Sequence, residues 1–166
     1  MTPQPPVSIV IPAWHRDDPQ LRQALQRLGA PGRAQVIVSL PREERRLIEQ
    51  WSAMYPHARF VDAPRGRASQ MNAGAAVATG KWLLFLHADT RLAQDWESVI
   101  ERANRATGVV GGSFRFALDS GDWRARLIEF GVRLRVALFG LPYGDQALFA
   151  RRDVFDAMGG DRKSVV

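Results

Sequence analysis

Short apolar runs alternate with segments of helical spacing through the first hundred residues, and this alternation limits the possible folds more than any other feature. The runs that predict strands are residues 7–13, 35–40, 58–63 and 82–86. Predicted helices follow the first three runs, starting near Asp17, Pro41 and Ser69. Alternation of this kind is typical of a mostly parallel sheet with helices on both faces, so we expect an α/β fold.

Finer signals within the helical segments predict their ends and inner faces. Gly29 fits the end of the first helix, and Gly80 fits the C-terminal cap of the third. In the second helix, four apolar residues at helical spacing predict the side that faces the sheet. These residues are Leu47, Ile48, Trp51 and Met54.

The run 82–86, WLLFL, is uniformly apolar, which predicts a central strand buried on both faces. The polar sequence His-Ala-Asp-Thr follows at 87–90. Because ligands of open α/β sheets bind beyond the carboxyl ends of the strands, we expect a site here. Asp89 suits a hard divalent cation that also takes phosphate oxygens. The competing interpretation is that Asp89 caps a helix starting near Leu92.

A second candidate region surrounds the start of the third predicted helix. Gly66 frees the backbone just before this helix, and Arg65 and Arg67 could meet an anion there. Asn72 and Gly74 lie inside the helix, although helix propensity favours neither residue. A closely packed glycine and an inward-reaching asparagine would explain both, and a tolerated glycine with a solvated asparagine is the alternative.

The last third of the chain holds a polar cluster and a segment with two apolar stripes. Residues 109–118 predict a strand with a glycine bend, and residues 122–140 predict a helix. One stripe of that helix contains Trp123, Leu127, Phe130, Leu134 and Leu138, and the other contains Ile128, Val132, Val136 and Phe139. A helix packed on one core needs only one stripe. The second could therefore meet a dimer partner, a membrane surface or a missing C-terminal segment, unless the helix is sandwiched within the domain.

The polar cluster comes after this predicted helix and before two consecutive arginines. It consists of Tyr143, Asp145 and Gln146. These residues could bind an acceptor or take part in catalysis, and a turn followed by a short strand is the competing interpretation.

Composition limits the partners. The chain has 166 residues, no cysteine and a net charge of +6, almost all of it from scattered arginines. It shows no nucleic-acid-binding motif, so we do not expect nucleic acid as a partner. We find no signal peptide and no apolar run of the ~20 residues that a membrane span needs, and we therefore expect a cytoplasmic protein, at most peripheral at the inner membrane.

Three stretches together resemble the inverting family 2 glycosyltransferases of GT-A fold. They are VSIVIPAW at 7–14, RASQMNAGAAVATGKWLLFLHADT at 67–90 and GDQALFARRDVFDAMGG at 144–160. Within that family, HADT and YGDQ make the chain most similar to the small bacterial group described as radical-SAM/selenodomain-associated glycosyltransferases. The resemblance implies a GT-A fold, a nucleotide-diphosphate sugar as donor, and Mg²⁺ or Mn²⁺ as the metal.

The resemblance also assigns roles to particular positions. The residues that it places around the donor are Pro12, Ala13, Arg67, Asn72, His87 and Asp89. Asp89 would hold the metal, because residues 87–89 occupy the place of the family's Asp-X-Asp motif. His87 stands where the family has its first acid.

Two departures from the family pattern affect what we expect. The segment 39–45 lacks the acidic turn that usually holds the nucleobase, which leaves the base open. The family's Glu-Asp pair, whose Asp is the usual base, is absent, so Asp145 is the remaining candidate for the base that an inverting transfer needs. We therefore expect residues 1–166 to form a single domain that lacks the family's C-terminal segment.

The expected function is a metal-dependent inverting glycosyltransferase with an unknown acceptor. A catalytically incomplete nucleotide-sugar-binding or assembly module is the alternative. A nucleotidyltransferase on a related sheet is less favoured, because residues 12–18, PAWHRDD, lack the glycine-rich basic loop expected after its first strand.

Overall fold

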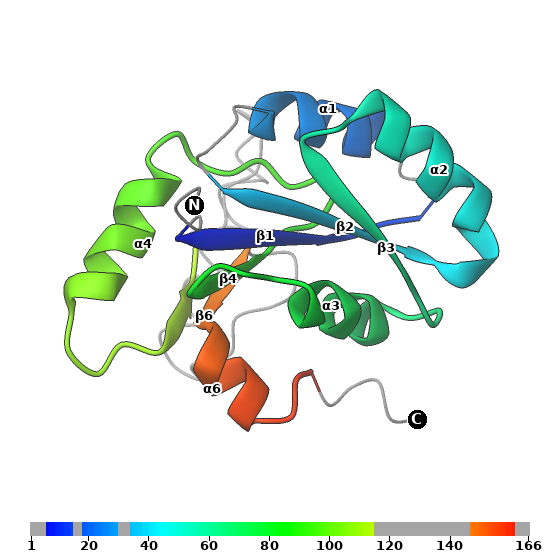
Figure 1. The fold of residues 1–166 in the computed structure, drawn as a ribbon. Helices are drawn as coiled ribbons and strands as arrows, with labels where there is room; N and C mark the ends of the chain where they lie inside the picture. The colour runs from blue at the N-terminus through cyan, green and yellow to red at the C-terminus, as the bar shows by residue number, and fades with distance from the viewer. Residues whose placement is uncertain (1–5, 15–17, 30–33, 115–146, 162–166) are drawn as a thin grey trace, which may run out of the picture.

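The computed structural model describes residues 6–14, 18–29, 34–114 and 147–161, and these residues build one six-stranded sheet with flanking helices (Figure 1). The strands are β1 (Val7–Pro12), β2 (Gln35–Pro41), β3 (Ala58–Ala63), β4 (Trp82–Phe85), β5 (Gly111–Ser113) and β6 (Leu148–Arg151). The helices are α1 (Asp18–Leu28), the 3₁₀ turn η2 (Arg42–Glu44), α2 (Arg45–Met54), α3 (Arg67–Ala76), α4 (Trp96–Arg105) and α6 (Arg152–Ala157).

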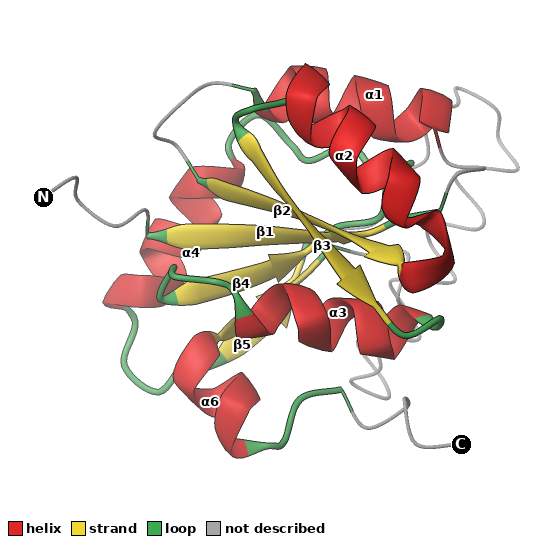
Figure 2. Cartoon of the chain, turned by 45° about the vertical axis from the view of Figure 1, so that its right-hand side comes forward, coloured by secondary structure: helices red, strands yellow, loops and turns green. Residues whose placement is uncertain are grey.

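The strand order is β3-β2-β1-β4-β6-β5, and the order reverses at β1 (Figure 2). Strands β1 to β4 are parallel, whereas β6 runs antiparallel to both β4 and β5. The chain therefore builds outward from β1 to β3 and then crosses to β4 on the other side of β1. This reversal is the position at which open α/β sheets bind ligands.

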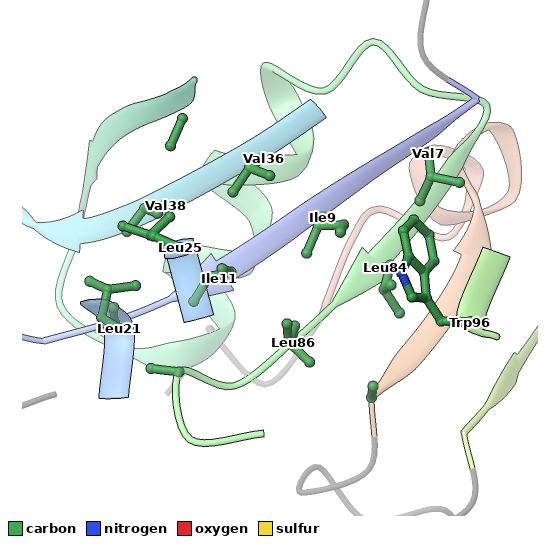
Figure 3. Close-up of a cluster of buried hydrophobic side chains, with 14 of the residues drawn as sticks. Val7, Ile9, Ile11, Leu21, Leu25, Val36, Val38, Leu84, Leu86 and Trp96 are labelled. Atoms are coloured by element: carbon green, nitrogen blue, oxygen red, sulfur yellow. The ribbon is translucent and has the colours of Figure 1, made fainter. Parts of the chain in front are cut away.

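Helices cover both faces of the sheet, as the alternation in the sequence predicts. Figure 1 shows α1 and α2 on one side of the sheet and α3 and α6 on the other. Successive strand residues point to opposite faces, so Ile9 and Ile11 pack with α1 while Val10 packs with α3. Figure 3 shows the larger cluster, in which Leu21 and Leu25 of α1 meet β1, β2 and β4.

Helix α2 follows its predicted inner face over most of its length. Trp51 is buried, and Leu47 and Ile48 are partly buried against the core. Met54 was expected on the same side, but it is 42% exposed, and that prediction is wrong. The helix ends at Met54, and the Tyr55 ring, stacked on Trp51 with a centroid distance of 5.5 Å, covers the core there instead.

Two glycines on the α3 side allow close approach of the backbone. A Cβ on Gly74 would lie 2.4 Å from Cγ1 of Val10, which confirms the prediction of a closely packed position. Gly80 was expected to cap α3, but α3 ends at Ala76 with Val77 as its C-cap, so that prediction is wrong. Gly80 instead passes against β1, where a Cβ would lie 2.6 Å from the Ser8 nitrogen.

The second half of the chain is described only in part. Strand β5 lies within the expected strand 109–118, whose last four residues fall outside the described ranges. The predicted helix 122–140 and the cluster of Tyr143, Asp145 and Gln146 also lie outside them. Across the part of the chain that is described, no helix is long and apolar enough to cross a membrane.

An exposed ion pair joins the end of β6 to the start of α6. Arg151 donates to the Asp153 carboxylate from Nε to Oδ1 at 3.1 Å and also from Nη2 to Oδ2. This side-chain hydrogen bonding is the main reason why the pKa of Arg151 is raised and the pKa of Asp153 is lowered. A lowered carboxyl pKa contributes stability above the unfolded value of 3.8, and this contribution is lost as the pH falls through the folded pKa.

We expect Arg151→Gln to raise the NMR titration midpoint of Asp153. An unchanged midpoint would assign the shift to the Val154 N–H, which also donates to Asp153 Oδ1.

Candidate functional site

The carboxyl ends of β1 and β4 lie side by side and form the candidate site. The Leu86 N–H donates to the Val10 carbonyl at 3.0 Å, which continues the pairing of the two strands to their ends. Beyond these ends, five residues line a small, mainly polar pocket of about 110 Å³. They are Pro12, Gln20, His87, Ala88 and Asp89. Pro12, His87 and Asp89, which the sequence predicts as site residues, therefore come together.

Asp89 lies exposed in a tight turn after β4. The Thr90 N–H donates to the His87 carbonyl at 3.1 Å, and Thr90 Oγ1 donates to Asp89 Oδ1 at 3.4 Å. Helix α4 begins only at Trp96, with Asp95 at its N-cap. The competing prediction that Asp89 caps a helix near Leu92 is therefore wrong, and Asp89 is instead one of the residues that line the pocket.

Ala13 lies directly after β1, and its hydrogen bonds to neighbouring elements come from its backbone. Its side chain is fully buried, and its N–H donates to the Ser39 carbonyl of β2 at 3.0 Å. The Ala13 carbonyl accepts a hydrogen bond from Nε2 of Gln70, a residue of α3 that the sequence did not single out. A glutamine in a helix of mostly small residues, one residue before the buried Met71, is the only local signal for it.

Arg65 and Trp14 form a second contact at this edge of the sheet. The Arg65 guanidinium lies over the Trp14 ring, 4.8 Å from its centroid. Trp14 follows β1, and Arg65 comes between β3 and α3. The contact joins the chain segments that follow two strands of the sheet, and the role of Trp14 in it was not predicted.

The other two predicted donor residues both lie in α3 but differ in their surroundings. Arg67 is the first residue of α3 and is exposed. Asn72 donates from Nδ2 to the Asp161 carbonyl at 3.1 Å and accepts the Asp161 N–H at 2.8 Å, so its amide anchors the chain that follows α6. The structure does not group Asn72 with the pocket residues.

Two larger hollows lie elsewhere. One of about 310 Å³ lies between α4 and the amino ends of β1 and β4, next to Lys81 and Trp82. The other, of about 590 Å³, is lined mainly by apolar residues such as Phe85 and Phe155. Neither contains a residue that the sequence predicts as a site residue, whereas the small polar pocket contains three.

No group of three or more acidic or histidine residues that could hold a metal ion occurs within the described ranges. Of the described residues that line the pocket, Asp89 is the one with a carboxylate, and His87 lines the pocket as well. Mg²⁺ is commonly held by one or two carboxylates together with substrate phosphates. The residues present therefore fit a metal that binds together with a phosphorylated ligand, and do not form a complete metal site by themselves.

The mostly parallel sheet that reverses at β1, with an antiparallel strand beyond β4, agrees with the GT-A fold that the resemblance implies. The chain belongs to glycosyl transferase family 2, whose family model matches residues 8–160. The match covers nearly the whole chain and includes all the residues that line the pocket.

Three solved structures illustrate the similarity in fold. The mannosyltransferase PcManGT from Pyrobaculum calidifontis, in complex with GDP-Man and Mn²⁺, matches with a TM-score of 0.65 and 18% identity over 96% of this chain and 48% of its own. Glucosyl-3-phosphoglycerate synthase from Mycobacterium tuberculosis with UDP gives 0.58 and 14% identity over 90% and 57%. TarS 1-349 from S. aureus with UDP-GlcNAc gives 0.55 and 11% identity over 92% and 47%.

The chain thus spans about half the length of the solved structures that it matches. No curated protein sequence gives a significant match. The assignment to the radical-SAM-associated group within the family stays a prediction.

Proposed function

We propose that this chain forms the donor-binding part of a metal-dependent, inverting glycosyltransferase that takes its sugar from a nucleotide-diphosphate donor. The observation that carries the proposal is the polar pocket in which Pro12, His87 and Asp89 meet at the reversal of strand order. The similar folds that hold GDP-Man with Mn²⁺, UDP and UDP-GlcNAc support it. The acceptor is unknown.

In this proposal Asp89 holds the metal together with the donor diphosphate. A divalent cation would supply positive charge to the nucleotide diphosphate as it leaves. Because Asp89 is the only carboxylate residue among the described residues of the pocket, the free protein should bind the metal weakly, and metal and nucleotide should bind together. Arg67 at the N-terminus of α3 adds positive charge at the same edge of the sheet, where helix N–H groups also favour anions.

Turnover requires a base that removes the proton of the acceptor hydroxyl. Asp145, which lies outside the described residues, stays our candidate for it. A chain that binds the donor without turning it over is the second function to consider, because residues 1–166 contain no Glu-Asp pair of the kind that supplies the family's usual base. The proposed location in the cytoplasm, with peripheral membrane contact or dimer formation through residues 122–140, stays a prediction.

Calorimetric titration tests the donor site. The wild-type chain is titrated with UDP, GDP and their sugar conjugates, each in Mn²⁺ and in EDTA. We expect the nucleotides of one base to bind in Mn²⁺. EDTA should weaken that binding at least tenfold, which corresponds to about 1.4 kcal/mol of binding free energy.

The same titration with Mn²⁺ alone serves as the control, and we expect little heat from it. Strong binding of Mn²⁺ without nucleotide would contradict the single-carboxylate site, and no binding of any nucleoside diphosphate by the folded chain would contradict the proposed function. Release of free sugar by hydrolysis of the donor in the same samples separates an enzyme from a binding module.

A further inference from the structure

A buried side-chain amide on α3 joins the carboxyl ends of β1 and β2. Gln70 is fully buried, and its Nε2 donates to the Ala13 carbonyl at 2.8 Å and to the Ser39 carbonyl at 2.7 Å. An amide nitrogen carries two hydrogens, so both are used. The opposite orientation of the amide would place Oε1 against two carbonyl oxygens, so these two acceptors fix which way the amide points.

The two carbonyl groups lie where the strands leave the sheet. The Ala13 carbonyl belongs to the planar peptide group that joins Ala13 to Trp14, so holding this oxygen fixes the direction in which the chain leaves β1. That direction is set one residue beyond Pro12, which lines the polar pocket, and immediately before Trp14, on which Arg65 stacks. The Ser39 carbonyl also accepts the Ala13 N–H at 3.0 Å, so the same bonds tie β2 to this point.

Gln70 places a polar side chain in a helix face that could pack on the sheet with apolar side chains alone. Met71 and Ala75 of the same helix pack on the sheet with apolar side chains. Gln70 Oε1 and Ser39 Oγ, by contrast, are buried and have no hydrogen-bond partner among the residues that the structure describes. Unpaired buried polar atoms cost stability. In return, the amide holds two carbonyl groups that neighbour Pro12 of the pocket, one on the next residue along the chain and one on its pairing partner in β2.

We infer that Gln70 is a positioning residue of the donor site, which acts through the Ala13 and Ser39 carbonyl groups without touching the donor itself. The inference rests on the proposed function, since it needs a donor to bind beside Pro12. Gln70 lies 57 residues from Ala13 and 31 from Ser39, and it links α3 to the two strand ends.

The test compares two glutamines whose side-chain amides bond at opposite ends of β1 and β2. Gln35 accepts the Ser8 hydroxyl at 2.6 Å and the Thr79 N–H at 2.8 Å, near the amino ends of β1 and β2. Gln70→Met and Gln35→Met each remove an amide that bridges neighbouring segments and keep the length of the side chain. We expect both to lower the melting temperature.

Donor binding separates the two variants. For the nucleoside diphosphate that the wild type binds in Mn²⁺, we expect Gln70→Met to raise Kd about tenfold, because misplacing a site by a fraction of an ångström has effects of this order. Gln35→Met should leave Kd within twofold of wild type. Gln70→Leu, which is uncharged and also removes both donors, is expected to give the same loss. It replaces Gln70→Met if circular dichroism shows that variant to be unfolded.

Wild-type affinity in a folded Gln70 variant would overturn the inference, and so would an equal loss in Gln35→Met, because the effect would then follow stability alone. A wild-type chain that binds no nucleoside diphosphate would instead overturn the proposed function, and with it the inference. The two failures are therefore told apart by the wild-type titration.

Discussion

Asp89→Ala is expected to abolish the effect of Mn²⁺ on donor binding. Among the residues that the structure describes, Asp89 is the one carboxylate residue that lines the polar pocket, so no described acid replaces it there. Losing even a hydrogen-bond partner of a metal ligand costs about 10- to 100-fold in affinity, so loss of the ligand itself should weaken binding in Mn²⁺ by at least about 100-fold. In EDTA, wild type and variant should bind the nucleotide with equal, weak affinity. Calorimetry in the two buffers measures both values.

Asp95→Ala is the matched control. Asp95 is an exposed carboxylate that follows the same strand, and as N-cap of α4 it makes no side-chain capping hydrogen bond. The Asp95→Ala substitution changes the net charge by the same amount as Asp89→Ala and leaves the pocket intact. An equal loss in Asp95→Ala would show that general charge, not the pocket, attracts the metal and its ligand, and an unchanged Asp89→Ala would remove the metal site from the proposal.

Gly74→Val is expected to cost at least about 3 kcal/mol of the free energy of unfolding, because the added atoms have no space in a fully packed core. A Cβ on Gly74 would lie 2.4 Å from Val10 Cγ1 and 2.9 Å from Ser39 Oγ. Val10 and Ser39 are fully buried on the central strands β1 and β2, so neither can move aside without shifting its strand. Urea denaturation followed by circular dichroism measures the loss.

Ala76→Val provides the comparison within the same helix. Ala76 is exposed at the last turn of α3, so the substitution changes little besides helix propensity and should cost less than about 1 kcal/mol. If Gly74→Val were as stable as Ala76→Val, α3 would pack less closely on the sheet than the structure shows. Donor binding by Gly74→Val is a further readout, since Ser39 is also a partner of Gln70.

Periodicity predicted the elements of the first half because each depends on its own residues. The run 58–63 matches β3 in full, and 35–40 differs from β2 by one residue. Periodicity failed at the ends of elements, where contacts from elsewhere decide. Gly80 looks like a helix cap by its position in the sequence. A glycine is needed there because the backbone of β1 at Ser8, 72 residues away, leaves no space for a Cβ.

The candidate site was predictable only in the part that the strand ends provide. Pro12, His87 and Asp89 follow strands that the sequence predicts, and parallel strands place their carboxyl ends at one edge. Asn72 also lies in a predicted element, but its partner Asp161 is 89 residues away. No local pattern contains that pairing.

The sequence by itself determined the α/β class, the order of strands and helices from β1 to β4, and the presence of an acid after a buried strand, because these features depend on periodicity within a few neighbouring residues. Only the tertiary structure decided that β4 pairs with β1, which brings Asp89 beside Pro12, and that Gln70 reaches the carbonyl groups of Ala13 and Ser39. Such contacts join residues that are distant in sequence, and they form because the buried faces of α3 and the sheet must exclude water while their polar groups find partners.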